Sequence, residues 1–174
     1  HENHFGGFER VGSYLGLDTK SSDYQQLEDR YIAMMAEHRL NPPLPARLRP
    51  SASEDGSIQV DDALDAAITN FVNTYHVSNI DVPHAPFGDI LGEDRAKAIN
   101  FYRSWYAYLD RKGWAKGAYL YMLDEPNDVE AYERVRQLGA LVKEAEPRLR
   151  RLVVEQPYTQ DPEWGSLDDA IDIW

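Results

Sequence analysis

The sequence predicts an α/β protein with a parallel sheet built from βαβ connections. Short hydrophobic stretches alternate with amphipathic helical stretches in units of roughly thirty to forty residues. Several strand candidates end in polar and aromatic residues, as in (β/α)8 barrels, whose active sites lie at that end. A full barrel typically needs about 250 residues, whereas this chain has 174. We therefore expect a single TIM-barrel-like domain over 1–174, an incomplete barrel of about five β/α units.

Four stretches have the apolar spacing of amphipathic helices, over about 23–37, 61–75, 94–112 and 128–145. Ser22 or Asp23 is expected to cap the first helix, and Asn127 with Glu130 to cap the last. The residues expected on the buried faces of the first, third and last helices are Tyr24, Leu27, Tyr31, Met34, Met35, Ile99, Tyr102, Trp105, Tyr106, Leu109, Val129, Tyr132, Val135, Leu138 and Val142.

Five short segments read as strands, at 38–42, 79–83, 119–123, 151–155 and 170–174. Between the first two helices lies a segment rich in proline, serine and charge without an apolar period. We expect a long loop there, over about 42–60, with a turn at 54–56.

Composition excludes several classes of function. The net charge of −12 argues against nucleic-acid partners and anionic membrane surfaces, because both need a basic field. The chain has no cysteine, which excludes disulfides and thiolate catalysis. No apolar run approaches the ~20 residues that cross a bilayer. The histidines outside the strand ends show no metal-ligand spacing, so we expect no metal and no other cofactor. Charge and composition leave the oligomeric state open.

Asp124 and Glu125 are the first candidates for a catalytic site. They end the aromatic strand candidate 118–123 and precede Pro126 and the last helix. Adjacent carboxylates repel each other when both are ionised, so one of the pair is a candidate proton donor. Acids also gather at helix amino termini, where the helix dipole favours them. Because Asn127 and Glu130 are expected to cap the helix, function is the preferred interpretation.

Further candidates lie near other strand ends. Glu155 could form a glycosidase pair with a carboxylate from the neighbouring strand, or it could be an ordinary solvated acid. His38 could hydrogen-bond a sugar hydroxyl, although a lone histidine near a helix end is more often structural. Tyr121, Tyr158 and Trp174 could stack on the apolar face of a sugar.

These motifs together resemble a known family. The segment 119–126 (Tyr-Leu-Tyr-Met-Leu-Asp-Glu-Pro), the helix that ends in 143–147 and the closing Ile-Asp-Ile-Trp at 171–174 are similar to glycoside hydrolase family 123. They equally resemble the related domain-of-unknown-function family 4091. The segment 31–42 is similar to the family's helix running into a His-Arg strand.

The resemblance implies a barrel glycosidase of the β-N-acetylhexosaminidase type in the full-length parent. Its substrates would be 2-acetamido sugars, typically terminal β-linked N-acetylgalactosamine, cleaved by a substrate-assisted retaining mechanism. Glu125 would protonate the leaving oxygen and later activate water, and Asp124 would orient the acetamido group. In this scheme Glu155 is not needed for the chemistry. The resemblance also favours an extracellular or periplasmic location.

Two other hypotheses remain open from the sequence. The chain could be a non-catalytic carbohydrate-binding or structural barrel fragment that keeps the aromatic residues without a complete site. Alternatively, Glu125 and Glu155 could act directly as a glycosidase pair, in which case substrates lacking an acetamido group would also be hydrolysed.

Overall fold

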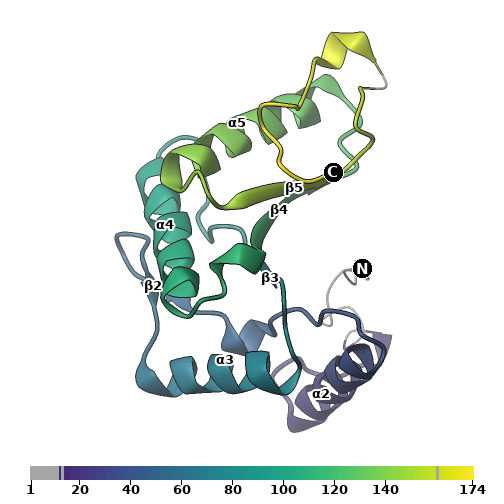
Figure 1. Ribbon diagram of the computed structural model, residues 1–174, viewed down its shortest axis with the longest axis vertical. Helices are drawn as coiled ribbons and strands as arrows, with labels where there is room; N and C mark the ends of the chain where they lie inside the picture. Colours follow the sequence, from purple (N-terminus) through teal and green to yellow (C-terminus); the bar gives the residue numbers. More distant parts are fainter. Residues whose placement is uncertain (1–11, 13, 160) are drawn as a thin grey trace. The chain divides into compact units, whose positions relative to one another are not determined.

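The computed structural model describes residues 12, 14–159 and 161–174, which form two compact units (Figure 1). Unit 1 takes the chain up to Arg49 together with Asp61–Ser78. Unit 2 takes Pro50–Val60 together with Asn79–Trp174. None of the helices in the described ranges is both long and apolar enough to cross a membrane.

Unit 1 contains the helices α2 (Ser22–Glu37) and α3 (Asp62–Thr74) and the 3-10 turn η1 (Ala46–Leu48). The cap of α2 is Ser21, one residue before the expected pair, and its hydroxyl accepts from the Tyr24 N–H at 3.1 Å. Asp61 caps α3 through the Leu64 N–H at 2.8 Å.

The buried face of α2 differs from the predicted stripe. It is formed by Tyr24, Ile32 and Met35 together with Glu28, which pairs with Arg47 of η1. Met34, expected in the core, is 46% exposed. The buried face is therefore shifted toward Glu28 and Ile32, and Arg47, whose side chain is 32% exposed, compensates the buried Glu28 carboxylate. A pattern of apolar residues cannot reveal such a pair.

The strand predicted at 38–42 is wrong. The backbone N–H groups of His38 and Leu40 donate to carbonyls in the last turn of α2, and Arg39 adopts a left-handed backbone with φ of 59°. This closes the helix as a C-terminal cap does. Because these donors already bond the helix, they are not available for a sheet.

Unit 2 begins with a small antiparallel hairpin inside the segment expected as one long loop. Strand β1 (Ser51–Ala52) pairs with β2 (Ile58–Gln59). The predicted turn at 54–56 is confirmed, and Gly56 takes a φ of 91° that favours glycine. Hydrogen bonds from Ser53 and Ser57 stabilise the Asp55 carboxylate in this turn and lower its pKa to about 2.

The rest of unit 2 alternates strands and helices around a parallel sheet of order β3-β4-β5. The elements are β3 (Ile80–Asp81), α4 (Arg95–Arg111), η2 (Ala115–Gly117), β4 (Ala118–Asp124), α5 (Val129–Ala145), β5 (Arg150–Val154) and η3 (Pro162–Trp164). Both strand pairs are parallel, so the predicted βαβ connections are confirmed. The aromatic face of α4 is buried as expected, with Tyr102 and Trp105 at 0% exposure.

The predicted TIM-barrel-like fold, an incomplete barrel of five β/α units, is wrong. In the described residues the parallel sheet has three strands, and the remaining two strands form the separate antiparallel hairpin. The helices α4 and α5 do not lie side by side as barrel helices do. Instead the C-terminal end of α5 meets the N-terminal half of α4 through Glu144 with Arg95 and the Ala145 carbonyl with Arg103 (Figure 1).

The strand expected at 170–174 is reduced to one parallel bridge between Leu152 and Ile173. The chain reaches it along α5 through η3, without a further helix (Figure 1). Gly139 of α5 permits this approach, because a Cβ there would lie 2.7 Å from the Ala170 carbonyl oxygen. In the described residues, a segment without a further α-helix packs against α5, where a barrel would place its next helix.

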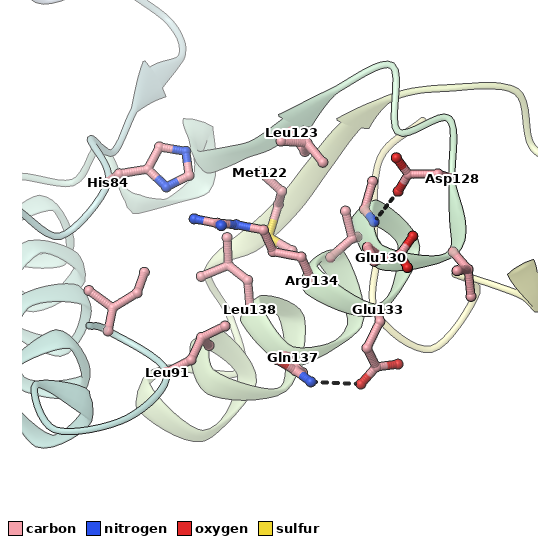
Figure 2. Close-up of a pocket in the computed structure, with 14 residues that line it drawn as sticks. His84, Leu91, Met122, Leu123, Asp128, Glu130, Glu133, Arg134, Gln137 and Leu138 are labelled. Carbon is pink, nitrogen blue, oxygen red and sulfur yellow. Dashed lines mark hydrogen bonds between the residues drawn. The ribbon is translucent and has the colours of Figure 1, made fainter. Parts of the chain in front are cut away.

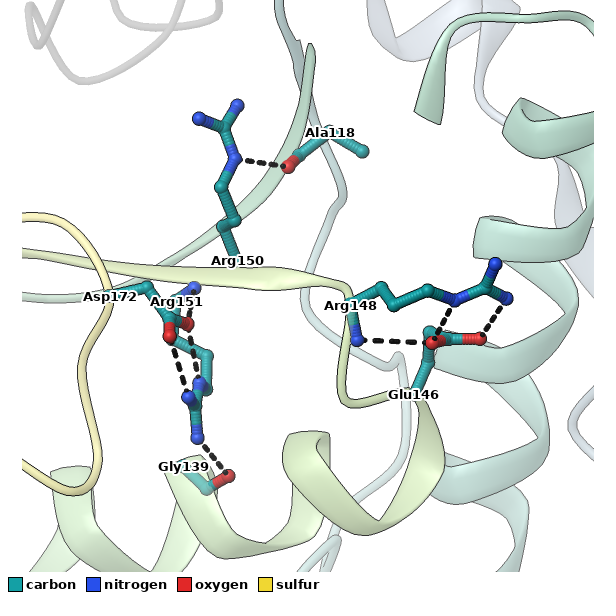
Figure 3. A network of polar contacts seen from close by, with 7 residues as sticks. All are labelled: Ala118, Gly139, Glu146, Arg148, Arg150, Arg151 and Asp172. Atoms are coloured by element: carbon teal, nitrogen blue, oxygen red, sulfur yellow. Dashed lines mark hydrogen bonds and ion pairs between the residues drawn. The ribbon is translucent and has the colours of Figure 1, made fainter. Parts of the chain in front are cut away.

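An ion pair fastens this C-terminal segment to the sheet. Arg151 of β5 donates to both carboxylate oxygens of Asp172, at 2.7 and 2.8 Å, and also to the Gly139 carbonyl (Figure 3). The Arg151 side chain is 6% exposed. The hydrogen bonds from Arg151 lower the pKa of Asp172.

Candidate active site

The candidate site lies at the carboxyl edge of the parallel sheet. Asp124 is the last residue of β4 and Glu125 follows it, while Glu155 follows the neighbouring strand β5. Asp124 and Glu125 are exposed, and Glu155 is half-buried. Ligands of open parallel sheets bind outside this edge, so all three carboxylates are placed for contact with a bound molecule.

Asp124 is held by a tyrosine from its own strand. The Tyr121 hydroxyl donates to Asp124 Oδ1 at 2.8 Å. The Tyr121 backbone N–H in turn donates to Asp81 Oδ1 of β3 at 3.2 Å. A carboxylate held in one orientation can accept a hydrogen bond from a ligand N–H with its remaining oxygen.

Glu125 has a strained backbone. Its φ is 43°, in the left-handed region that few residues other than glycine adopt, and its N–H donates to the Val154 carbonyl at 2.9 Å. Such strain costs of order 1–3 kcal/mol and clusters at functional sites. The buried Pro126 follows directly and restricts how Glu125 can relax.

Glu125 and Glu155 line the same hollow. Its other lining residues are Asn127, Val154 and Gln156, and its volume is about 430 Å³. The Gln156 N–H donates to Glu155 Oε1 at 2.7 Å and orients that carboxylate. The structure thus forms two pairs of predicted residues, Tyr121 with Asp124 and Glu125 with Glu155.

The expected capping pair of Asn127 and Glu130 is wrong, because Asp128 caps α5. Its Oδ1 accepts from the Ala131 N–H at 2.7 Å. The first residue of α5, Val129, is 44% exposed, so its predicted place in the core is wrong. The consequence for the site is unchanged, since α5 needs neither Asp124 nor Glu125 as its cap.

Removing this cap gives a first testable expectation. Asp128→Ala should lower the free energy of unfolding by about 1 kcal/mol, because the Ala131 N–H loses its acceptor. Asn127→Ala is the matched control, and it should change stability less. Urea unfolding followed by tryptophan fluorescence measures both. If Asn127→Ala had the larger effect, the assignment of the cap to Asp128 would be wrong.

The remaining predicted binding residues do not line the hollow. His38 belongs to unit 1 and caps the C-terminal end of α2. Tyr158 and Trp174 are 68% and 41% exposed in unit 2. Their exposure leaves the aromatic faces accessible for stacking on a sugar.

A larger pocket in unit 2 was not anticipated from the sequence. It has a volume of about 940 Å³ and lies between β4, the first half of α5 and the segment 84–91 (Figure 2). Its lining includes His84, Leu91, Met122, Arg134 and Leu138. The sequence places His84 after a strand, but no local pattern connects it with a helix fifty residues later.

In the described ranges, no three histidine, aspartate or glutamate side chains gather closely enough to hold a metal ion. The comparisons with known proteins add no family: no protein-family model matches the chain, and no curated protein matches it.

Proposed function

We propose that the chain is a glycoside hydrolase domain that acts on 2-acetamido sugars, in particular terminal β-N-acetylgalactosaminides. The observation that carries this proposal is that two adjacent carboxylates have different surroundings. Asp124 is oriented by Tyr121, whereas Glu125 has a strained backbone and lines a hollow at the sheet edge. A general acid beside a fixed acceptor is the arrangement that substrate-assisted cleavage needs.

In the proposed reaction, Glu125 donates its proton to the glycosidic oxygen as the bond to the anomeric carbon breaks. The carbonyl oxygen of the substrate's own acetamido group attacks that carbon and forms a cyclic intermediate. Asp124 accepts a hydrogen bond from the acetamido N–H and stabilises the positive charge that develops on the ring. Glu125, now ionised, takes a proton from water, which opens the intermediate with overall retention.

The exposed aromatic residues support a carbohydrate as the partner. Tyr158 and Trp174 follow β5, the strand that carries Glu155, and offer accessible rings. Sugars present apolar faces to such rings and hydroxyls to neighbouring polar groups.

A second candidate is a glycosidase that uses Glu125 and Glu155 directly. The shared hollow favours it, because two carboxylates facing one cavity are the usual machinery of retaining and inverting enzymes. In this case the acetamido group takes no part in the reaction.

A pair of matched substrates separates these mechanisms. We expect the chain to hydrolyse an aryl β-N-acetylgalactosaminide but not the corresponding aryl β-galactoside. Glu155→Gln should keep the hydrolysis rate within about threefold of the wild-type rate, since Glu155 takes no part in the substrate-assisted reaction. Hydrolysis of the galactoside that disappears in Glu155→Gln would favour the second mechanism. If calorimetry detected binding of N-acetylgalactosamine without hydrolysis of either glycoside, the domain would be a non-catalytic sugar-binding module.

A further inference from the structure

The larger pocket of unit 2 is separate from the carboxylate hollow. The two cavities have no lining residue in common, and the pocket lies against α5 and the segment after β3. Its volume of about 940 Å³ is near the upper end of the range of small-molecule sites, about 300–1,000 Å³.

Arg134 directs its charge into this pocket. Glu130 lies one helical turn before it, at the spacing that favours an ion pair, yet no such pair forms between them. Instead the guanidinium extends toward His84, as Figure 2 shows. No acid in the described ranges pairs with Arg134, although the chain has 30 acidic residues and only 18 basic ones. Other arginines of unit 2, such as Arg95, Arg148 and Arg151, are bound to carboxylates.

The acids around the pocket are separated from this basic end. Asp128 is engaged as the cap of α5, and Glu133 accepts from Gln137 and Arg136. In Figure 2 the carboxylates of Asp128 and Glu130 lie on the side away from His84. The pocket therefore has one end with two potential donors to an anion, the Arg134 guanidinium and the His84 imidazole.

The wall next to this basic end is apolar. Met122 and Leu138 are buried and Leu91 is half-buried, and all three line the pocket. A purely inorganic anion would leave this wall in contact with water. A ligand with an apolar body and a single terminal anion would cover the wall and reach the basic end at the same time.

We propose that this pocket is a binding site for a small carboxylate with an apolar aryl or alkyl body. The planar fork of Arg134 matches the two oxygens of a carboxylate. His84 donates a further hydrogen bond, and Leu91, Met122 and Leu138 pack against the body of the ligand. The site is independent of the carboxylates at the sheet edge, so it stands whether or not the chain hydrolyses glycosides.

The test uses two probes with the same apolar body, 4-phenylbutyrate and its amide, in which an uncharged group with one acceptor and one NH2 donor replaces the carboxylate. We expect isothermal titration calorimetry to detect the carboxylate and to show about tenfold weaker binding of the amide, because bonds to a charged group are lost. Arg134→Met keeps most of the apolar stem and should weaken carboxylate binding by about tenfold or more. It should leave binding of the amide nearly unchanged.

The matched control is Arg30→Gln, which removes one positive charge from the exposed face of α2 and should not change binding. Circular dichroism checks that each variant is folded, and Arg134 is exposed, so its substitution leaves the core intact. Equal affinity for the two probes, equal loss in both variants, or no binding of 4-phenylbutyrate to the folded protein would each overturn the proposal.

Discussion

Replacing Glu125 by glutamine is expected to lower kcat/KM for an aryl β-N-acetylgalactosaminide by about 10²–10⁴-fold, the usual contribution of a general acid. Glutamine keeps the shape and polarity of the side chain but cannot donate a carboxylic proton. The loss should depend on the leaving group. A leaving group of low pKa, such as 2,4-dinitrophenolate, needs little protonation, so its release should be less affected than that of phenolate.

A second active-site variant and a control variant accompany Glu125→Gln. Asp124→Asn should also reduce the rate, but its effect should not follow the leaving-group pKa, because Asp124 is proposed to act on the acetamido group. Glu163→Gln removes one exposed carboxylate of η3 and serves as the control. Undiminished hydrolysis in both Glu125→Gln and Asp124→Asn would remove the basis for the proposed function.

Asp172→Asn is expected to lower the free energy of unfolding more than Asp128→Ala or Glu144→Gln does. It leaves the buried guanidinium of Arg151 with a neutral partner in place of a carboxylate. Breaking a buried ion pair costs about 3–5 kcal/mol, and because the Asp172 side chain is 35% exposed we expect about 2–4 kcal/mol here. All four tryptophans belong to unit 2, so urea unfolding followed by tryptophan fluorescence reports on this unit.

The effect of Asp172→Asn should also depend on pH. Because Arg151 holds the pKa of Asp172 below its ordinary value in the folded protein, the pair contributes its full stability above the unfolded-state pKa of about 3.9. This contribution is lost as the pH falls through the lowered folded-state pKa. The difference between wild type and variant should therefore narrow in acid.

Glu144→Gln is the control for this prediction. It breaks the pair with Arg95, whose two side chains are 39% and 54% exposed, and should shift the unfolding midpoint much less. An Asp172→Asn shift no larger than that of Glu144→Gln would show that the C-terminal segment is not fastened by this ion pair.

The helices and the direction of the strands could be predicted from local pattern. The aromatic face of α4 repeats at helical spacing, and Gly113, which follows the C-cap residue Lys112, takes a positive φ of 77°. The alternation of β3, α4, β4 and α5 also leads to parallel pairing, since short connections leave few other arrangements.

Local pattern could not predict whether the sheet closes into a barrel, or which residues cap the helices. A barrel depends on how successive helices pack, and here α5 meets α4 end-on while Gly139 admits the C-terminal segment. Asn127 and Asp128 are adjacent and both are common cap residues, so residue type alone does not decide between them. The bend at His38 depends on carbonyls of α2 that accept donors from the following residues.

The candidate site, too, could be predicted only in part from local pattern. Asp124 and Glu125 stand out because they are adjacent and follow an aromatic strand. The Tyr121 hydroxyl and Asp124 are three residues apart on one strand and would lie on opposite faces if β4 were regular, but the β4–β5 pairing is irregular between Tyr121 and Leu123. The hollow shared by Glu125 and Glu155 depends on the register of β4 against β5, which neither strand defines alone. Arg134 carries no signal in the sequence, because its direction is a choice of rotamer.

The hydrogen bond from the Glu125 N–H to the Val154 carbonyl has a mechanical consequence. It continues the ladder between β4 and β5 past the last residue of β4, so the backbones that carry Glu125 and Glu155 cannot separate without breaking the sheet. A bound molecule can change the distance between the two carboxylates only by rotating their side chains. The spacing of the two backbones is thus set before any ligand binds, and binding does not have to order two independent loops.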